Sequence, residues 1–284
     1  MPLEDDYNAV RRALWIATDG TYKQAAGLFE RKKTALTQQN VSLEDIPPDF
    51  SRAPVVSHYG EPLTFEPDRD EWEDTARRLS GLFDGYPELY SSSVRVMFYS
   101  GDMLFVSSEG TEVAEPHTLA TINVNAYTQA EDGEPLNDHL AWHALDDGGL
   151  PSYGEMERAI LDMAERLVRL KTAPAFDDTY FGPVLVEGQA AGEFFCQRLF
   201  GNAGGLMASR RPIVSRAGGF APRTEETTIE DRIGRRILAR DLTVRALPRT
   251  RTFDGVTLIG GFNVDTEGVV PPEEIVLVEH GILK

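Results

Sequence analysis

Cysteine is almost absent from this chain, which has a single one, Cys196, in 284 residues. One cysteine excludes an internal disulfide framework. Long apolar runs are also missing, because no hydrophobic stretch approaches the ~20 residues needed to span a membrane. The opening residues MPLED lack the basic and apolar regions of a signal peptide. We therefore expect a cytoplasmic protein that makes no contact with a membrane.

Positive charge is scarce as well. The chain has 28 Lys and Arg against 46 Asp and Glu, for a net charge of −18. Binding to phosphate backbones needs clustered Lys and Arg, so we expect no direct contact with nucleic acid. Hydrophobic residues make up 41% of the chain, enough for a real core and against global disorder. The length suggests one large or two ordinary domains.

Three segments carry apolar residues at helical spacing, which predicts helices over residues 7–37, 68–83 and 152–171. The buried stripe expected in the last helix contains Met156, Ile160, Met163, Leu167 and Leu170. Residues 40–67 are rich in proline and are predicted to be an extended connector.

The middle and end of the chain favour β structure. Residues 92–130 alternate as strands, with one turn predicted at residues 100–102 and a hairpin turn at Glu109-Gly110. Residues 118–128 are typical of a longer strand, and residues 212–284 have β character throughout.

The predicted class is therefore α+β: a curved antiparallel sheet with covering helices, followed by a β-rich C-terminal domain. We divide the chain into residues 1–67 (long helix and connector), 68–205 (α+β domain) and 206–284 (β-rich C-terminal domain, incomplete).

The most informative stretch is residues 180–197, which read YFGPVLVEGQAAGEFFCQ. The pattern predicts a buried strand, a glycine-containing turn and the first turns of a helix. This wording resembles the TldD/PmbA family of zinc-peptidase-related proteins, which once carried the name modulators of DNA gyrase. Further blocks resemble the same family in the same order: RRALWIATD near the start, FVSSEGT at residues 105–111, RRIL at 235–238, and GGFNVDTEGVV and VLVEHGILK at the end.

The resemblance implies a metal helix whose ligands are missing here. In active members the strand and turn lead into a His-Glu-x-x-x-His (HExxxH) helix that holds zinc. The corresponding positions in this chain are Cys196, Gln197 and Gly201. Glycine offers no ligand, glutamine cannot take up a proton as a carboxylate does, and a lone cysteine does not make a site. We expect no metal or cofactor in this chain and interpret Cys196 as a partly buried structural residue.

Family members run well beyond 284 residues at both ends. We therefore interpret the chain as a split gene, a truncated frame or a trimmed form, whose C-terminal sheet another polypeptide could complete. The resemblance implies a hetero- or homo-oligomer, most simply a heterodimer. In it this non-catalytic, peptide-binding chain shapes a proteolytic chamber with a TldD-like HExxxH subunit that carries the zinc. The substrate implied is an extended peptide or an unfolded protein.

Two alternatives stay open. His139 and His143 are spaced i and i+4, and on a helix they could bind zinc in a relocated peptidase site. Alternatively, the chain is a stand-alone interaction or inhibitory protein that docks on an active relative.

Overall fold

Two long strands that are neighbours in sequence dominate the fold. The computed structural model describes residues 6–46, 48, 52–174, 179–200, 205–206 and 229–284. β2 (Ser91–Val106) pairs antiparallel with β3 (Glu112–Gln129) without interruption, from Ser91 opposite Tyr127 to Val106 opposite Glu112. The strands turn where expected: the Ser107 N–H donates to the Thr111 carbonyl at 3.0 Å, and Gly110 has φ of 100°.

The turn predicted at residues 100–102 is wrong, because these residues continue β2. Gly101 lies opposite His117 in the middle of the ladder. Local turn propensity is weak compared with the cross-strand pairing of a long ladder. One continuous strand therefore replaces the two short ones expected.

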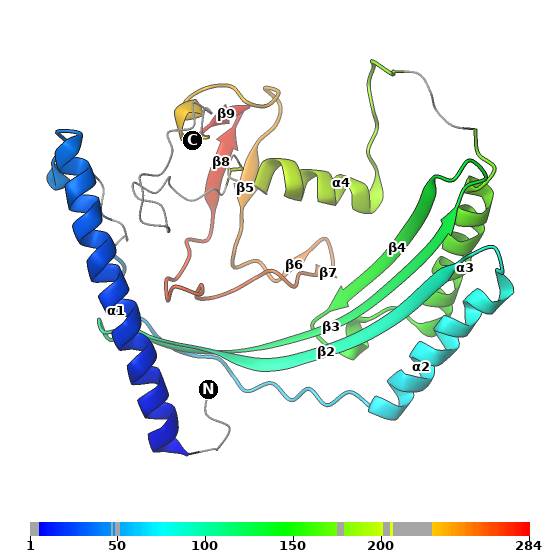
Figure 1. The fold of residues 1–284 in the computed structure, drawn as a ribbon, viewed down its shortest axis with the longest axis horizontal. Helices are drawn as coiled ribbons and strands as arrows, with labels where there is room; N and C mark the ends of the chain where they lie inside the picture. Colours follow the sequence, from blue (N-terminus) through cyan, green and yellow to red (C-terminus); the bar gives the residue numbers. More distant parts are fainter. Residues whose placement is uncertain (1–5, 47, 49–51, 175–178, 201–204, 207–228) are drawn as a thin grey trace. The chain divides into compact units, whose positions relative to one another are not determined.

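Two further strands pair with the other side of β3. β4 (Pro135–Ala144) pairs antiparallel with it, and the short β1 (Ser57–Tyr59) pairs parallel with it near its start. Among the described strands, none pairs with the outer side of β2, so β2 is an edge strand along its whole length. Figure 1 shows the sheet curving, with helices on its convex side.

The helices on this face enclose the hydrophobic core. α2 (Arg69–Gly81), followed by the 3-10 turn η2 (Leu82–Gly85), packs against β2, whereas α3 (Tyr153–Leu170) packs against β3 and β4. The largest fully buried side chains of this core are Leu79, Ile122, Val124, Met156, Ile160, Met163 and Leu167. The α+β class with a curved sheet and covering helices is confirmed.

The helices predicted over residues 68–83 and 152–171 begin next to residues whose side chains cap them. The Asp68 side chain accepts hydrogen bonds from the backbone N–H groups of residues 70 and 71 at the start of α2. At the start of α3, the Ser152 hydroxyl and N–H both donate to the Glu155 carboxylate. Both predicted helices are confirmed, but Leu170, expected in the buried stripe, is 42% exposed because it is the last residue of α3.

The N-terminal helix is also confirmed: α1 (Tyr7–Gln38) is capped by the preceding Asp6, whose side chain accepts a hydrogen bond from the Ala9 N–H. Only Ala35 and Leu36 of this helix are buried. The 3-10 turns η1 (Leu43–Asp45), η3 (Asp147–Gly149) and η5 (Glu230–Arg232) complete the short helical elements.

The C-terminal part contains only short strands, and its β-rich character is confirmed. β6 (Thr252–Phe253) and β7 (Val256–Thr257) form one hairpin, and β8 (Ile275–Glu279) and β9 (Ile282–Leu283) form another. β5 (Val244–Ala246) precedes them. The β structure expected in residues 212–228 lies outside the described residues.

The chain divides into two compact units. The sheet unit comprises Ala53–Pro183 and Arg245–Val276, and the terminal unit comprises Met1–Arg52, Val184–Val244 and Leu277–Lys284. The division into residues 1–67, 68–205 and 206–284 stays a prediction. No helix in the described ranges is both long and apolar enough to cross a membrane.

Candidate functional site

The helix predicted after residue 187 is present in the terminal unit. α4 (Gly188–Phe195) starts at a glycine with φ of 59° and continues into the π-helical turn η4 (Cys196–Phe200). The buried strand predicted before it is wrong, because residues 180–187 form no strand and Val184 and Leu185 are 74% and 82% exposed. A strand needs a neighbour to take its backbone hydrogen bonds, and no described strand lies beside this segment.

The residues at the family's motif positions lie at the end of this helix. Cys196 has a free, exposed thiol, so its interpretation as partly buried is wrong. The Gln197 amide donates to the Glu193 carboxylate one turn earlier, at 3.4 Å. Gly201 lies outside the described residues. Within the described part of the chain, no group of three or more His, Cys, Asp or Glu is arranged to hold a metal ion.

The alternative zinc pair does not lie on a helix. His139 and His143 belong to β4, opposite Asn125 and Thr121 of β3. Four residues along a strand span about 13 Å, whereas zinc binds imidazole nitrogens at about 2.0–2.1 Å. The helical prediction is wrong, and the two imidazoles cannot share one ion.

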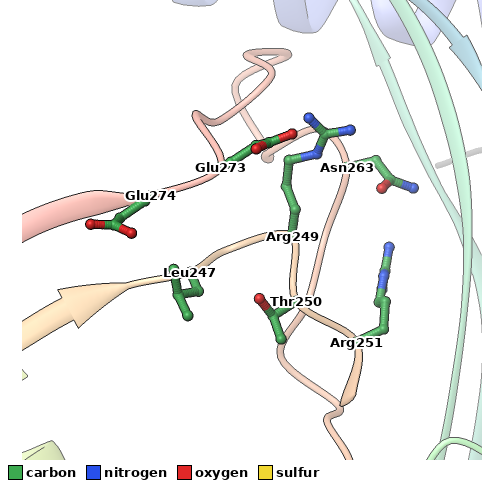
Figure 2. A pocket seen from close by; sticks show the side chains of 7 residues that line it. All are labelled: Leu247, Arg249, Thr250, Arg251, Asn263, Glu273 and Glu274. Atoms are coloured by element: carbon green, nitrogen blue, oxygen red, sulfur yellow. The ribbon is translucent and has the colours of Figure 1, made fainter. Parts of the chain in front are cut away.

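An open pocket of about 550 Å³ lies in the sheet unit, in its C-terminal segment (Figure 2). Its lining residues are Leu247, Arg249, Thr250, Arg251, Asn263, Glu273 and Glu274. Two arginines from one short stretch and two glutamates from another give the pocket both signs of charge.

The charges in this pocket are only partly paired. Glu274 forms an ion pair with Arg245 at 3.4 Å, and the Arg251 guanidinium donates to the Gly261 carbonyl. Arg249 and Glu273 have no ion-pair partner among the described residues. The pocket therefore offers one free guanidinium and one free carboxylate, which suits a polar ligand with both charges.

Next to this pocket lies a buried carboxylate that sequence reasoning missed. The Glu115 side chain of β3 is only 11% exposed, and one of its oxygens lies in close hydrogen-bond contact with the His58 imidazole of β1. The Asn263 amide donates to its other oxygen at 3.5 Å, and the Arg251 guanidinium lies 3.9 Å from that oxygen. We call Glu115, His58, Arg251 and Asn263 the Glu115 cluster.

The Glu115 cluster joins the C-terminal segment of the sheet unit to the sheet itself. Gly268 packs so closely on the end of β2 and the turn that follows it that a Cβ there would lie 2.5 Å from the Phe105 ring and 3.0 Å from the Thr111 methyl group. Glu115 and its neighbours thus fix the wall of the pocket. No local sequence signal could reveal this, because Glu115 lies 57 residues from His58 and 148 from Asn263.

Comparison with known proteins gives a fold but no close relative. No protein-family model and no curated protein matches the chain. Among solved structures, it is similar to a crystal structure of a protein assigned as a modulator of DNA gyrase from Bacteroides thetaiotaomicron. The two are 14% identical, with a TM-score of 0.52, over 76% of this chain and 44% of that one. Over the matched residues, this chain shares the fold of that protein.

This shared fold agrees with the resemblance to the TldD/PmbA family, whose members once carried the same name as the Bacteroides protein. The chain matches less than half the length of the Bacteroides protein. Within this fold, the chain presents three features of interest: the motif helix α4 with η4, the open pocket with the Glu115 cluster, and the free edge of β2.

Proposed function

We propose that this chain is a non-catalytic, TldD/PmbA-like subunit that holds an extended peptide for a zinc-bearing partner subunit. The observation that carries the proposal is the outer edge of β2, which no described strand covers over 16 residues. An extended peptide can add to such an edge as a further strand, because main-chain hydrogen bonds supply affinity whatever the sequence.

The length of this edge favours a binding role. Strands in globular proteins usually run five or six residues, and natural edge strands are short or protected by proline, bulges or several charges. β2 is much longer, contains no proline, and carries only Arg95 and Asp102 as charged residues. An edge with so little protection suits an extended partner.

The non-catalytic part of the proposal rests on the motif helix. Gln197 stands where active relatives have the glutamate that deprotonates a zinc-bound water, and an amide cannot serve as that base. Cys196 could ligate zinc as a thiolate, but among the described residues it belongs to no group of three or more His, Cys, Asp or Glu that could hold the ion. Zinc and catalysis would then belong to an HExxxH-bearing partner.

Reconstitution tests the division of labour. We would assay cleavage of an unfolded protein by the chain alone, by an HExxxH-bearing relative alone, and by their mixture. We expect no cleavage by the chain alone and faster, chelator-sensitive cleavage by the mixture than by the relative. Chelator-sensitive cleavage by the chain alone, with zinc near one per chain by elemental mass spectrometry, would overturn the proposal.

N-methylated peptides test the edge directly without altering the chain. In an added strand, alternate N–H groups face β2 and the others face away. Methylating one alternate set should abolish binding, and methylating the other set should leave it unchanged. Equal effects from both sets would rule out strand addition.

A further inference from the structure

Two pockets open on opposite faces of β2. The first, the apolar pocket of about 300 Å³, is lined by Pro67, Arg69, Trp72, Glu73, Ala76, Val96 and Phe98. The second, the polar pocket of about 350 Å³, is lined by Ser93, Arg95, Met97, Asn123 and Asn125. Even-numbered β2 residues contribute to one pocket and odd-numbered residues to the other, as the alternation of a strand requires.

The apolar pocket lies between β2 and the helix that covers it. α2 packs against β2, which is the edge strand. The Trp72 and Phe98 rings meet edge to face with centroids 5.4 Å apart, and Ala76 leaves room beside them. A side chain entering from a strand added to β2 would lose water against two aromatic rings and Val96. An aliphatic residue suits this space.

The polar pocket has the opposite chemistry. Arg95 has no carboxylate partner among the described residues, and the other residues that line the pocket are two asparagines, a serine and Met97. Where β2, β3 and β4 pair, none of the odd-numbered residues on this face (91–99, 121–129 and 135–143) is Asp or Glu. In a chain of net charge −18, this face repels an anion less than the rest of the surface does.

We infer that the β2 edge selects an extended segment in which aliphatic and acidic residues alternate. The inference rests on the proposed function, because it assigns the side chains of the strand that β2 would bind. In an added strand about 4.8 Å away, side chains directly opposite lie about 4.5–5.5 Å apart at Cβ. The acidic residue pairs with Arg95, and the aliphatic residues opposite Val96 and Phe98 enter the apolar pocket.

Four short fluorescent peptides test the alternation by anisotropy on the full chain. They alternate Val with Asp, Val with Asn, Val with Lys, and Ser with Asp. We expect the Val-Asp peptide to bind about two- to fivefold tighter than Val-Asn, the usual worth of one cross-strand charge pair. It should bind about tenfold tighter than Ser-Asp, because valine buries apolar surface.

Variants assign each preference to its pocket. Arg95→Gln should remove the preference for Asp over Asn, and Arg95→Glu should reverse it in favour of the Val-Lys peptide. Ala76→Leu fills the apolar pocket and should reduce the preference for Val over Ser while leaving the melting temperature unchanged or higher. Arg169→Gln removes a charge from an exposed position on α3 and should change neither preference.

The possible outcomes distinguish a failure of the inference from a failure of the proposed function. If all four peptides bind equally well, the chain still holds extended peptides and the inference is wrong. If Arg95→Glu binds Val-Lys no better than Val-Asp, Arg95 does not read the peptide and the inference is also wrong. If no peptide binds, the proposed function fails and the inference fails with it.

Discussion

The core of the sheet unit and the segment that leads into α4 both contain large apolar side chains, but the two sets differ in exposure. Ile122, Ile160 and Leu167 are completely buried between β3 and α3, whereas Phe181 and Leu185 are 91% and 82% exposed. The first group sits where a sheet and two helices close on each other. The second has no described element to cover it. Hydrophobic residues therefore indicate burial only where the fold supplies a second surface.

The largest effect should come from the buried side of this comparison. Ile160→Ala removes a fully buried side chain and should lower the free energy of unfolding by about 2–5 kcal/mol. Leu185→Ala, the matched exposed change, should stay within about 0.5 kcal/mol. Urea denaturation followed by circular dichroism measures both. A comparable loss in Leu185→Ala would mean that this segment is covered in solution.

The next largest effect is expected at Glu115, with Glu112 on the same strand as its comparison. Glu115→Ala removes the buried carboxylate that the His58, Arg251 and Asn263 side chains contact and should cost about 1–3 kcal/mol. Glu112→Ala removes an exposed hydrogen bond from the Tyr59 hydroxyl and should cost less than about 1 kcal/mol. Limited proteolysis should cut residues 245–276 faster in the Glu115 variant alone. Equal proteolysis of both variants would show that the Glu115 cluster does not hold this segment.

A smaller effect is expected at the first turn of α3. Ser152→Ala removes the hydroxyl that donates to Glu155 and should cost about 1 kcal/mol, the usual loss for an N-terminal capping side chain. Thermal unfolding at neutral pH measures it. Thr172→Ala, just beyond the end of the same helix, serves as the control and should change the melting temperature less.

The same site should respond to acid. Hydrogen bonds from the Ser152 side chain and then its backbone hold the pKa of Glu155 below its ordinary value. A lowered pKa in the folded state means that the stabilisation is complete above the unfolded pKa, ~4.3, and is lost as pH falls through the folded pKa. Ser152→Ala should flatten this acid-side loss of stability. An unchanged pH profile would show that Glu155 gains nothing from Ser152.

The smallest effect concerns Cys196. Its exposed thiol should react with a maleimide in the native protein, and Cys196→Ser should leave the melting temperature within about 2 °C. Mass spectrometry counts the label. Reaction only after unfolding would show that the end of the motif helix is covered.

Elements with a local pattern could be predicted from sequence. α2 and α3 follow from apolar spacing and from the capping residues Asp68 and Ser152. The hairpin turn at Gly110 follows from its glycine. Helix patterns and turn residues act over a few positions, so the chain itself contains what decides them.

Elements that depend on residues far apart in the sequence do not follow from local patterns. Gly101 has turn propensity but lies within a ladder that pairs it with His117. The i, i+4 spacing of the two histidines of β4 suits a helix, although Leu140 and Trp142 alternate toward the core as a strand requires. The polar pocket likewise draws Arg95 and Asn123 from different strands, so no motif indicates it.

The adjacency of β2 and β3 in sequence also orders the events of folding. A tight turn at residues 107–110 lets this hairpin close with little loss of chain entropy, so we expect its ladder to form early. Asn263 and Glu115 are 148 residues apart in the sequence, so their contact closes a much longer loop. That carboxylate therefore stays hydrated until late, and slow hydrogen exchange should appear in the β2–β3 ladder before it appears in residues 245–276.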